Sequence, residues 1–129
     1  MTRQAFTSQD APAPGGPYSH AIEANGFYFT AGFGPHHPQT GEIPTSVADQ
    51  THQVMKSLEA VLHARGLTLG EVVKTTVHLS SLEHFEEFNE VYATYFNDPY
   101  PARTTVGSEL NGFDVEIDVV AVVPQNQTE

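Results

Sequence analysis

The chain of 129 residues contains no cysteine and only five lysines and arginines. Without cysteine there is no disulfide framework, no thiolate nucleophile and no cysteine-ligated zinc, which is typical of a reducing compartment. No apolar run approaches the ~20 residues that a membrane-spanning helix requires. The first ten residues also lack the apolar stretch of a signal peptide. These absences predict a soluble, cytoplasmic protein.

The scarcity of cations is the second notable feature. Sixteen aspartates and glutamates give a formal net charge of -11. Such a charge repels phosphates, so we predict no nucleic-acid partner. From Thr75 onward Arg103 is the only lysine or arginine, among ten acidic residues: Glu83, Glu86, Glu87, Glu90, Asp98, Glu109, Asp114, Glu116, Asp118 and Glu129. Arg103 is therefore either paired with an internal carboxylate or kept for a ligand.

The length and the 39% hydrophobic content are those of one globular domain over residues 1–129. Periodicity and turn signals predict, in chain order, a loop over 1–17, strands over 18–24 and 27–32, a helix over 47–65, a strand over 72–79, a helix over 82–96, and strands over 103–106 and 115–123. The hairpin depends on Asn25-Gly26, and the first helix depends on Ser46 as N-cap and Gly66 as stop.

The order of these elements predicts an α+β fold in which two helices cover one face of a mixed sheet. Nothing in the sequence covers the other face, which we therefore expect to meet another subunit. We expect Phe85, Phe88 and Phe96 of the second helix to lie in the core.

Several kinds of chemistry have little support. Gly32-Phe33-Gly34 is followed by prolines and not by a helix, so it is not a dinucleotide-binding turn. The seven histidines are not spaced to converge on a metal, and His36-His37, adjacent in a loop, is expected to face solvent. No Gly-x-Ser-x-Gly motif is present for a serine nucleophile. We predict no metal site and no nucleotide cofactor.

The remaining candidates are Tyr18, Arg103 and Glu116. Tyr18 stands where a loop becomes a strand, where a side chain lines either a cleft or the core. Arg103 and Glu116 belong to the last two predicted strands, which would share a cleft if they were adjacent and antiparallel. A guanidinium binds a carboxylate bidentately, and a glutamate orients or deprotonates water. The alternative is a simple ion pair between Arg103 and Glu116.

Ordered motifs with family-like spacing connect these candidates: Ala11-Pro12, Gly16-Pro17-Tyr18-Ser19, Thr40-Gly41-Glu42, Gln50-Thr51, Val73-Lys74-Thr75-Thr76-Val77, Phe88-Asn89-Glu90-Val91-Tyr92, Pro101-Ala102-Arg103 and Val115-Glu116-Ile117. Over residues 11–123 the chain resembles the reactive intermediate deaminase (RidA, or YjgF) family, also described as endoribonuclease L-PSP. Residues 1–10 and 124–129 would then be an N-terminal segment and a polar tail.

The resemblance implies a chorismate-mutase-like α+β subunit that forms a homotrimer, with active sites in clefts between subunits. It implies hydrolysis of 2-imino acids and their enamines, such as 2-aminoacrylate and 2-iminobutanoate, to 2-keto acids and ammonia without a cofactor. By this resemblance Arg103 binds the substrate carboxylate and Glu116 positions the water. Tyr18, Asn89 and backbone groups near Gly32 and Thr105 shape the pocket.

Three segments depart from the family pattern. Ala31-Gly32-Phe33 replaces Ser-Gly-Gln, Thr105 replaces a common cysteine, and Leu110-Asn111 replaces Leu-Pro. With Phe33 at the pocket wall, these changes predict a bulkier or more apolar imine, or a reduced activity. A member that binds 2-keto acids without catalysis is the alternative. The ribonuclease label of the family conflicts with the acidic charge.

Overall fold

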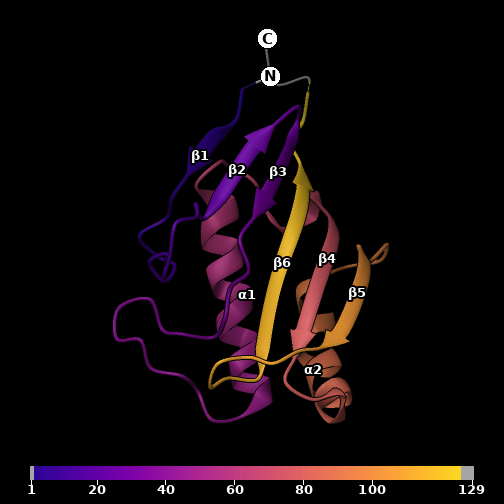
Figure 1. Ribbon diagram of the computed structural model, residues 1–129. Helices are drawn as coiled ribbons and strands as arrows, with labels where there is room; N and C mark the ends of the chain where they lie inside the picture. The colour runs from indigo at the N-terminus through magenta and orange to yellow at the C-terminus, as the bar shows by residue number, and fades with distance from the viewer. Residues whose placement is uncertain (1, 126–129) are drawn as a thin grey trace.

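The computed structural model describes residues 2–125 of the chain. Its strands and helices are β1 (Gln4–Phe6), β2 (Ala21–Ala24), β3 (Phe27–Thr30), α1 (Val47–His63), β4 (Val72–Leu79), α2 (Phe85–Tyr92), β5 (Ala102–Gly107) and β6 (Val115–Val122). Both helices lie on the same face of one six-stranded sheet, as Figure 1 shows. The predicted α+β class with two helices on one face is confirmed.

The order of strands in the sheet is β1-β2-β3-β6-β4-β5. All neighbours are antiparallel except β4 and β5, which run parallel. The last two strands are not adjacent, because β4 lies between β5 and β6, so the condition under which Arg103 and Glu116 would share a cleft within one chain is not met. The reason is the crossover through α2: a strand that follows a helical crossover pairs in parallel with the strand before it.

The predicted hairpin is confirmed, with shorter strands. Ala24 pairs with Phe27 across a turn in which both Asn25 (φ 55°) and Gly26 (φ 81°) adopt positive φ, as a two-residue hairpin requires. The predicted loop over 1–17 is wrong at β1, which pairs with β2. A strand of three residues is too short to show a periodicity.

The first helix is confirmed, and Ser46 caps it by accepting a hydrogen bond at Oγ from the Asp49 backbone N–H (3.0 Å). Gly66 follows its end with a φ of 79°. The hydroxyl of the fully buried Tyr28 on β3 donates to the Val61 carbonyl oxygen in the last turn (2.6 Å). Burial raises the pKa of Tyr28 to about 12, so this bond ties α1 to the sheet at neutral pH.

The second helix is shorter than predicted and is flanked by 3-10 turns over Leu82–His84 and Ala93–Tyr95. Phe88 and Phe96 are buried as expected. Phe85 is 39% exposed and so does not belong to the core. The apolar face of this helix is therefore divided: Phe88 packs in the core, and Phe85 lies at the surface.

The two faces of the sheet differ sharply. The face under the helices carries the buried Val115, Ile117 and Val119, while Glu116 and Asp118 alternate with them onto the open face. Burial raises the pKa of Asp118, and the neighbouring His78 and Lys74 oppose that shift. Within residues 2–125 no helix is long and apolar enough to cross a membrane. The predicted polar tail lies outside the described residues from 126 onward.

Candidate active site

Glu116 lines a cleft of about 740 Å³ between the loop that follows β3 and the segment that precedes β6. The backbone of Gly32 lies against its carboxylate: a methyl group on Gly32 would stand 2.6 Å from Glu116 Oε2. Only glycine therefore leaves the carboxylate where it is. The pairing of Glu116 with His78 across β6 and β4 places the carboxylate on the open face of the sheet.

Tyr18 lines the same cleft and is 51% exposed. Its hydroxyl oxygen accepts a hydrogen bond from the Gly15 backbone N–H (2.9 Å), which leaves the hydroxyl proton for another acceptor. Of the two readings of Tyr18, cleft or core, the structure therefore supports the cleft.

Phe33 borders the cleft with its ring turned inward. Its backbone exchanges two hydrogen bonds with Ile117 (2.9 and 3.1 Å), and its side chain is 4% exposed. The ring packs edge-on against His20, with ring centroids 5.3 Å apart. The expected aromatic wall is thus part of the core, and Phe33 does not make the cleft more apolar.

The histidine pair lies in the loop that forms the other side of the cleft. His37 is exposed, and its Nδ1 accepts from the backbone N–H groups of Gln39 (3.2 Å) and Thr40 (3.3 Å). His36 is half-buried and packs edge-on against Phe113, with ring centroids 5.1 Å apart. Both side chains were expected to face solvent; His36 does so only in part, because its ring packs against Phe113.

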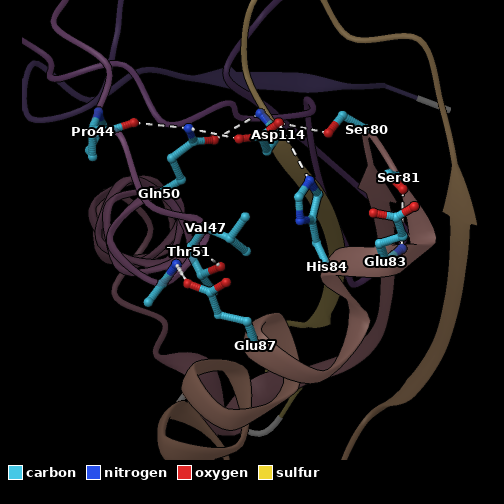
Figure 2. A network of polar contacts seen from close by, with 11 residues as sticks. Pro44, Val47, Gln50, Thr51, Ser80, Ser81, Glu83, His84, Glu87 and Asp114 are labelled. Carbon is cyan, nitrogen blue, oxygen red and sulfur yellow. Dashed lines mark hydrogen bonds and ion pairs between the residues drawn. The ribbon is translucent and has the colours of Figure 1, made fainter.

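A polar network holds the segment before β6 in place, as Figure 2 shows. The amide of the buried Gln50 donates to the Pro44 carbonyl (2.9 Å) and accepts from the Asp114 backbone N–H (2.8 Å). Asp114 Oδ1 accepts from the Ser80 hydroxyl (2.7 Å). Because Asp114 lies between Phe113 and Val115, this network fixes the side of the cleft that Phe113 occupies.

Arg103 lies in a separate groove of about 290 Å³ that Asn89 and Tyr100 also line. Its guanidinium carbon lies 4.8, 5.5 and 5.6 Å from the ring centroids of Tyr92, Phe88 and Phe85 on α2, within the range of cation–π attraction. Within residues 2–125 it makes no ion pair.

Tyr92 is fixed in this ring platform by a 2.8 Å hydrogen bond between its hydroxyl and that of Thr75. Burial raises the pKa of Tyr92, while Thr75 and Arg103 oppose that shift. From the sequence, Phe85 and Phe88 were expected in the core, so the ring surface that Phe85, Phe88 and Tyr92 form under Arg103 was not predicted. The signal was present: Phe85, Phe88 and Tyr92 repeat at three- and four-residue intervals on one helix face.

The two candidate catalytic side chains point away from opposite faces of the sheet. Arg103 pairs with the buried Thr75 and extends under α2, whereas Glu116 pairs with His78 on the open face. Arg103 and Glu116 therefore do not form the ion pair within one chain that was the alternative interpretation.

Thr105 lies two residues beyond Arg103 on the same face of β5. Tyr18, Gly32 and Glu116 gather at one surface, and Asn89 and Arg103 at another.

No group of three histidine, aspartate or glutamate side chains within residues 2–125 is arranged to hold a metal ion. The fold and these two surfaces define an α+β protein with a carboxylate-bearing cleft on one side of its sheet and an arginine-bearing groove on the other. Both surfaces display groups suited to a small polar ligand.

Comparison with known proteins identifies the family. The family model described as endoribonuclease L-PSP matches residues 8–123. A RutC family protein of Pyrococcus horikoshii is 42% identical over 121 residues, which cover 93% of this chain and 96% of that protein. Reactive Intermediate Deaminase A, chloroplastic, of Arabidopsis thaliana is 41% identical over 95% of this chain and 67% of its own length. The chain belongs to the reactive intermediate deaminase (RidA/YjgF) family.

Solved structures agree with this assignment. The crystal structure of Escherichia coli TdcF with bound serine has a TM-score of 0.88 at 34% identity, and the match covers 94% of this chain and 99% of that one. That relative is named a putative reactive intermediate deaminase. The family resemblance seen in the sequence motifs is thereby confirmed.

Proposed function

We propose that this protein hydrolyses reactive 2-imino acids and their enamines, of the 2-aminoacrylate and 2-iminobutanoate class, to 2-keto acids and ammonia. The observation that carries the proposal is the position of Arg103 and Glu116 on opposite faces of one sheet. A site that uses both must be completed by a second copy of the chain, with the arginine groove of one subunit facing the carboxylate cleft of the next. The names of the deaminase relatives support the reaction type.

Arg103 is suited to hold the substrate carboxylate. Its planar guanidinium binds a carboxylate with two parallel hydrogen bonds, and it lies over the rings of Tyr92, Phe88 and Phe85. Serine bound to TdcF is a small molecule with such a carboxylate. The imine carbon is then fixed relative to Glu116, which replaces an encounter in solution by a positioned attack.

Glu116 carries the proton transfers. Its carboxylate accepts a proton from water as the water oxygen bonds to the carbon of the protonated imine, and a neutral carbinolamine forms. The glutamic acid gives that proton to the nitrogen. The C–N bond then breaks as the carbinolamine hydroxyl gives its proton back to the carboxylate, and ammonia leaves with the 2-keto acid. General acid–base catalysis by a positioned carboxylate contributes on the order of a hundredfold to ten-thousandfold. Tyr18, with its free hydroxyl proton, and Asn89 are assigned to substrate binding.

The proposed assembly is a homotrimer. The open face of the sheet displays Phe27 and Phe29, which are 43% and 44% exposed. Exposed apolar side chains gathered on an uncovered sheet face mark an interaction surface. A closed ring of identical copies would cover this face and create one site at each boundary between subunits.

The test is the rate of 2-keto acid formation from 2-aminoacrylate and 2-iminobutanoate generated enzymatically in the assay. Acceleration over buffer supports catalysis, and its absence contradicts it. The second candidate is a protein that binds 2-keto acids without turnover, which Ala31 favours because it lacks the hydroxyl of the family serine. Calorimetric binding of 2-ketobutanoate without turnover of any imine would establish that candidate instead.

Substituting Gly32→Ala tests the position of the Glu116 carboxylate. The added methyl group would stand 2.6 Å from Oε2 and 3.1 Å from Cδ of Glu116, so the carboxylate must move. We expect kcat to fall roughly tenfold to a hundredfold, since a displacement of about 1 Å at a reacting group has effects of this size.

The matched control is Gly107→Ala, where the nearest atom to the new methyl group is Leu82 Cγ at 3.8 Å. This variant should keep wild-type kcat, and both variants should unfold at wild-type temperatures. Wild-type kcat in folded Gly32→Ala would show that the observed position of the Glu116 carboxylate is not needed.

A further inference from the structure

We infer that His36 and Asn111 select imines whose side chain is uncharged and accepts hydrogen bonds, such as an amide. The inference rests on the proposed function and assigns the residues that determine its substrate. Both residues line the cleft that holds Glu116 and Tyr18. They come from the two segments that face each other across it, the loop after β3 and the segment before β6.

The ring of His36 is held in place by its packing. It lies edge-on against Phe113, and both rings lie against the backbone of Gly34. A methyl group on Gly34 would stand 3.0 Å from Phe113 Cε1 and 3.3 Å from His36 Cε1. Phe113 is in turn fixed by its neighbour Asp114, which the Gln50 amide holds. The imidazole is thus held at the edge of the cleft by its packing against Phe113.

The side chains of His36 and Asn111 can still form hydrogen bonds with a ligand in the cleft. Among the described residues neither the His36 ring nor the Asn111 side-chain amide has a hydrogen-bond partner. The neighbouring His37 differs, because its Nδ1 already accepts two backbone N–H groups in its own turn. His36 is half-buried and Asn111 is exposed, so a ligand that packs against them displaces water and must replace its hydrogen bonds, which an apolar isostere cannot do.

The charge of the cleft favours a substrate with an uncharged side chain over one with an acidic side chain. The residues that line the cleft include Glu116 and neither lysine nor arginine, and the chain as a whole carries a formal charge of -11. A second carboxylate on the substrate would meet repulsion from Glu116, while Arg103 of the neighbouring subunit is already engaged by the first carboxylate. The inward-turned ring of Phe33 removes the reason to expect an apolar preference.

The experiment compares the imines of asparagine and leucine, generated in the assay by an amino acid oxidase. Their side chains have nearly the same shape, an amide in one and an isopropyl group in the other. We expect His36→Leu to lower kcat/KM for the asparagine imine about tenfold relative to the leucine imine, which corresponds to about 1.4 kcal/mol for one lost hydrogen bond.

Two further variants serve as controls for His36→Leu. His36→Gln keeps a hydrogen-bonding group and should restore most of the ratio of the two kcat/KM values. His63→Leu makes the same change at an exposed position at the end of α1 and should leave that ratio unchanged. An equal fall for both imines in His36→Leu, or no change for either, overturns the inference, as does a wild-type preference for the aspartate imine over the asparagine imine.

A protein without imine hydrolase activity would give a different result from one in which only the role of His36 is wrong. If the wild-type protein accelerates the hydrolysis of no imine, calorimetry with the 2-keto acids of asparagine and leucine replaces the rate measurement. Weaker binding of the amide-bearing acid alone in His36→Leu would uphold His36 as a selectivity residue of a binding protein. Equal binding of the two acids by wild type and variant would remove that role.

Discussion

Replacing Arg103 by alanine is expected to lower kcat/KM for 2-iminobutanoate by about a thousandfold, or about 4 kcal/mol. The reason is the loss of a bidentate, charge-assisted contact to the substrate carboxylate. Within residues 2–125 Arg103 has no ion-pair partner that would account for it structurally. The rate of 2-keto acid formation over a range of substrate concentrations measures the effect.

Arg103→Lys is the matched variant for this prediction. Lysine keeps the positive charge but lacks the planar fork and stacks less well on the rings of Phe85, Phe88 and Tyr92. It should recover only part of the lost activity. Thermal unfolding serves as the control for folding. A folded Arg103→Ala protein with wild-type kcat/KM would contradict the assignment of Arg103 to the substrate carboxylate.

Substituting Glu116→Gln is expected to reduce kcat about a thousandfold while binding of 2-ketobutanoate changes little, because the amide keeps the size of the side chain and cannot accept the proton from water. Single-turnover kinetics would separate the chemical step from product release. Glu116→Asp should be intermediate, since it keeps the base but withdraws it from the cleft. A kcat in Glu116→Gln within about threefold of wild type would exclude proton transfer by this carboxylate as a major term.

Much of the fold could be predicted because its signals are local. Asn25-Gly26 defined the hairpin, Ser46 and Gly66 bounded α1, and the β-branched run over 72–79 gave β4. The order of strands in the sheet could not be obtained this way. Pairing between distant segments leaves no periodicity, and the placement of β4 between β5 and β6 follows from the crossover through α2.

The candidate site, too, could be predicted only in part from the sequence. Motifs pointed to Arg103 and Glu116, but their position on opposite faces of the sheet depends on pairing register, which motifs do not contain. The direction of the Phe33 ring was hidden too, because a loop residue gives no indication of which side it turns to. His36 came to light only through its contact with Phe113, which lies 77 positions away in the sequence.

We propose that each active site takes its arginine from one subunit and its glutamate from another. To test this directly, the inactive Arg103→Ala and Glu116→Gln proteins are mixed in equal amounts. They are unfolded and refolded together so that their subunits exchange, and the rate of 2-iminobutanoate hydrolysis is then measured. Native mass spectrometry confirms that mixed assemblies have formed. Random assortment places an intact arginine opposite an intact glutamate at about a quarter of the sites. We predict recovery of about a quarter of wild-type activity; mixed assemblies as inactive as the separate variants would contradict the account.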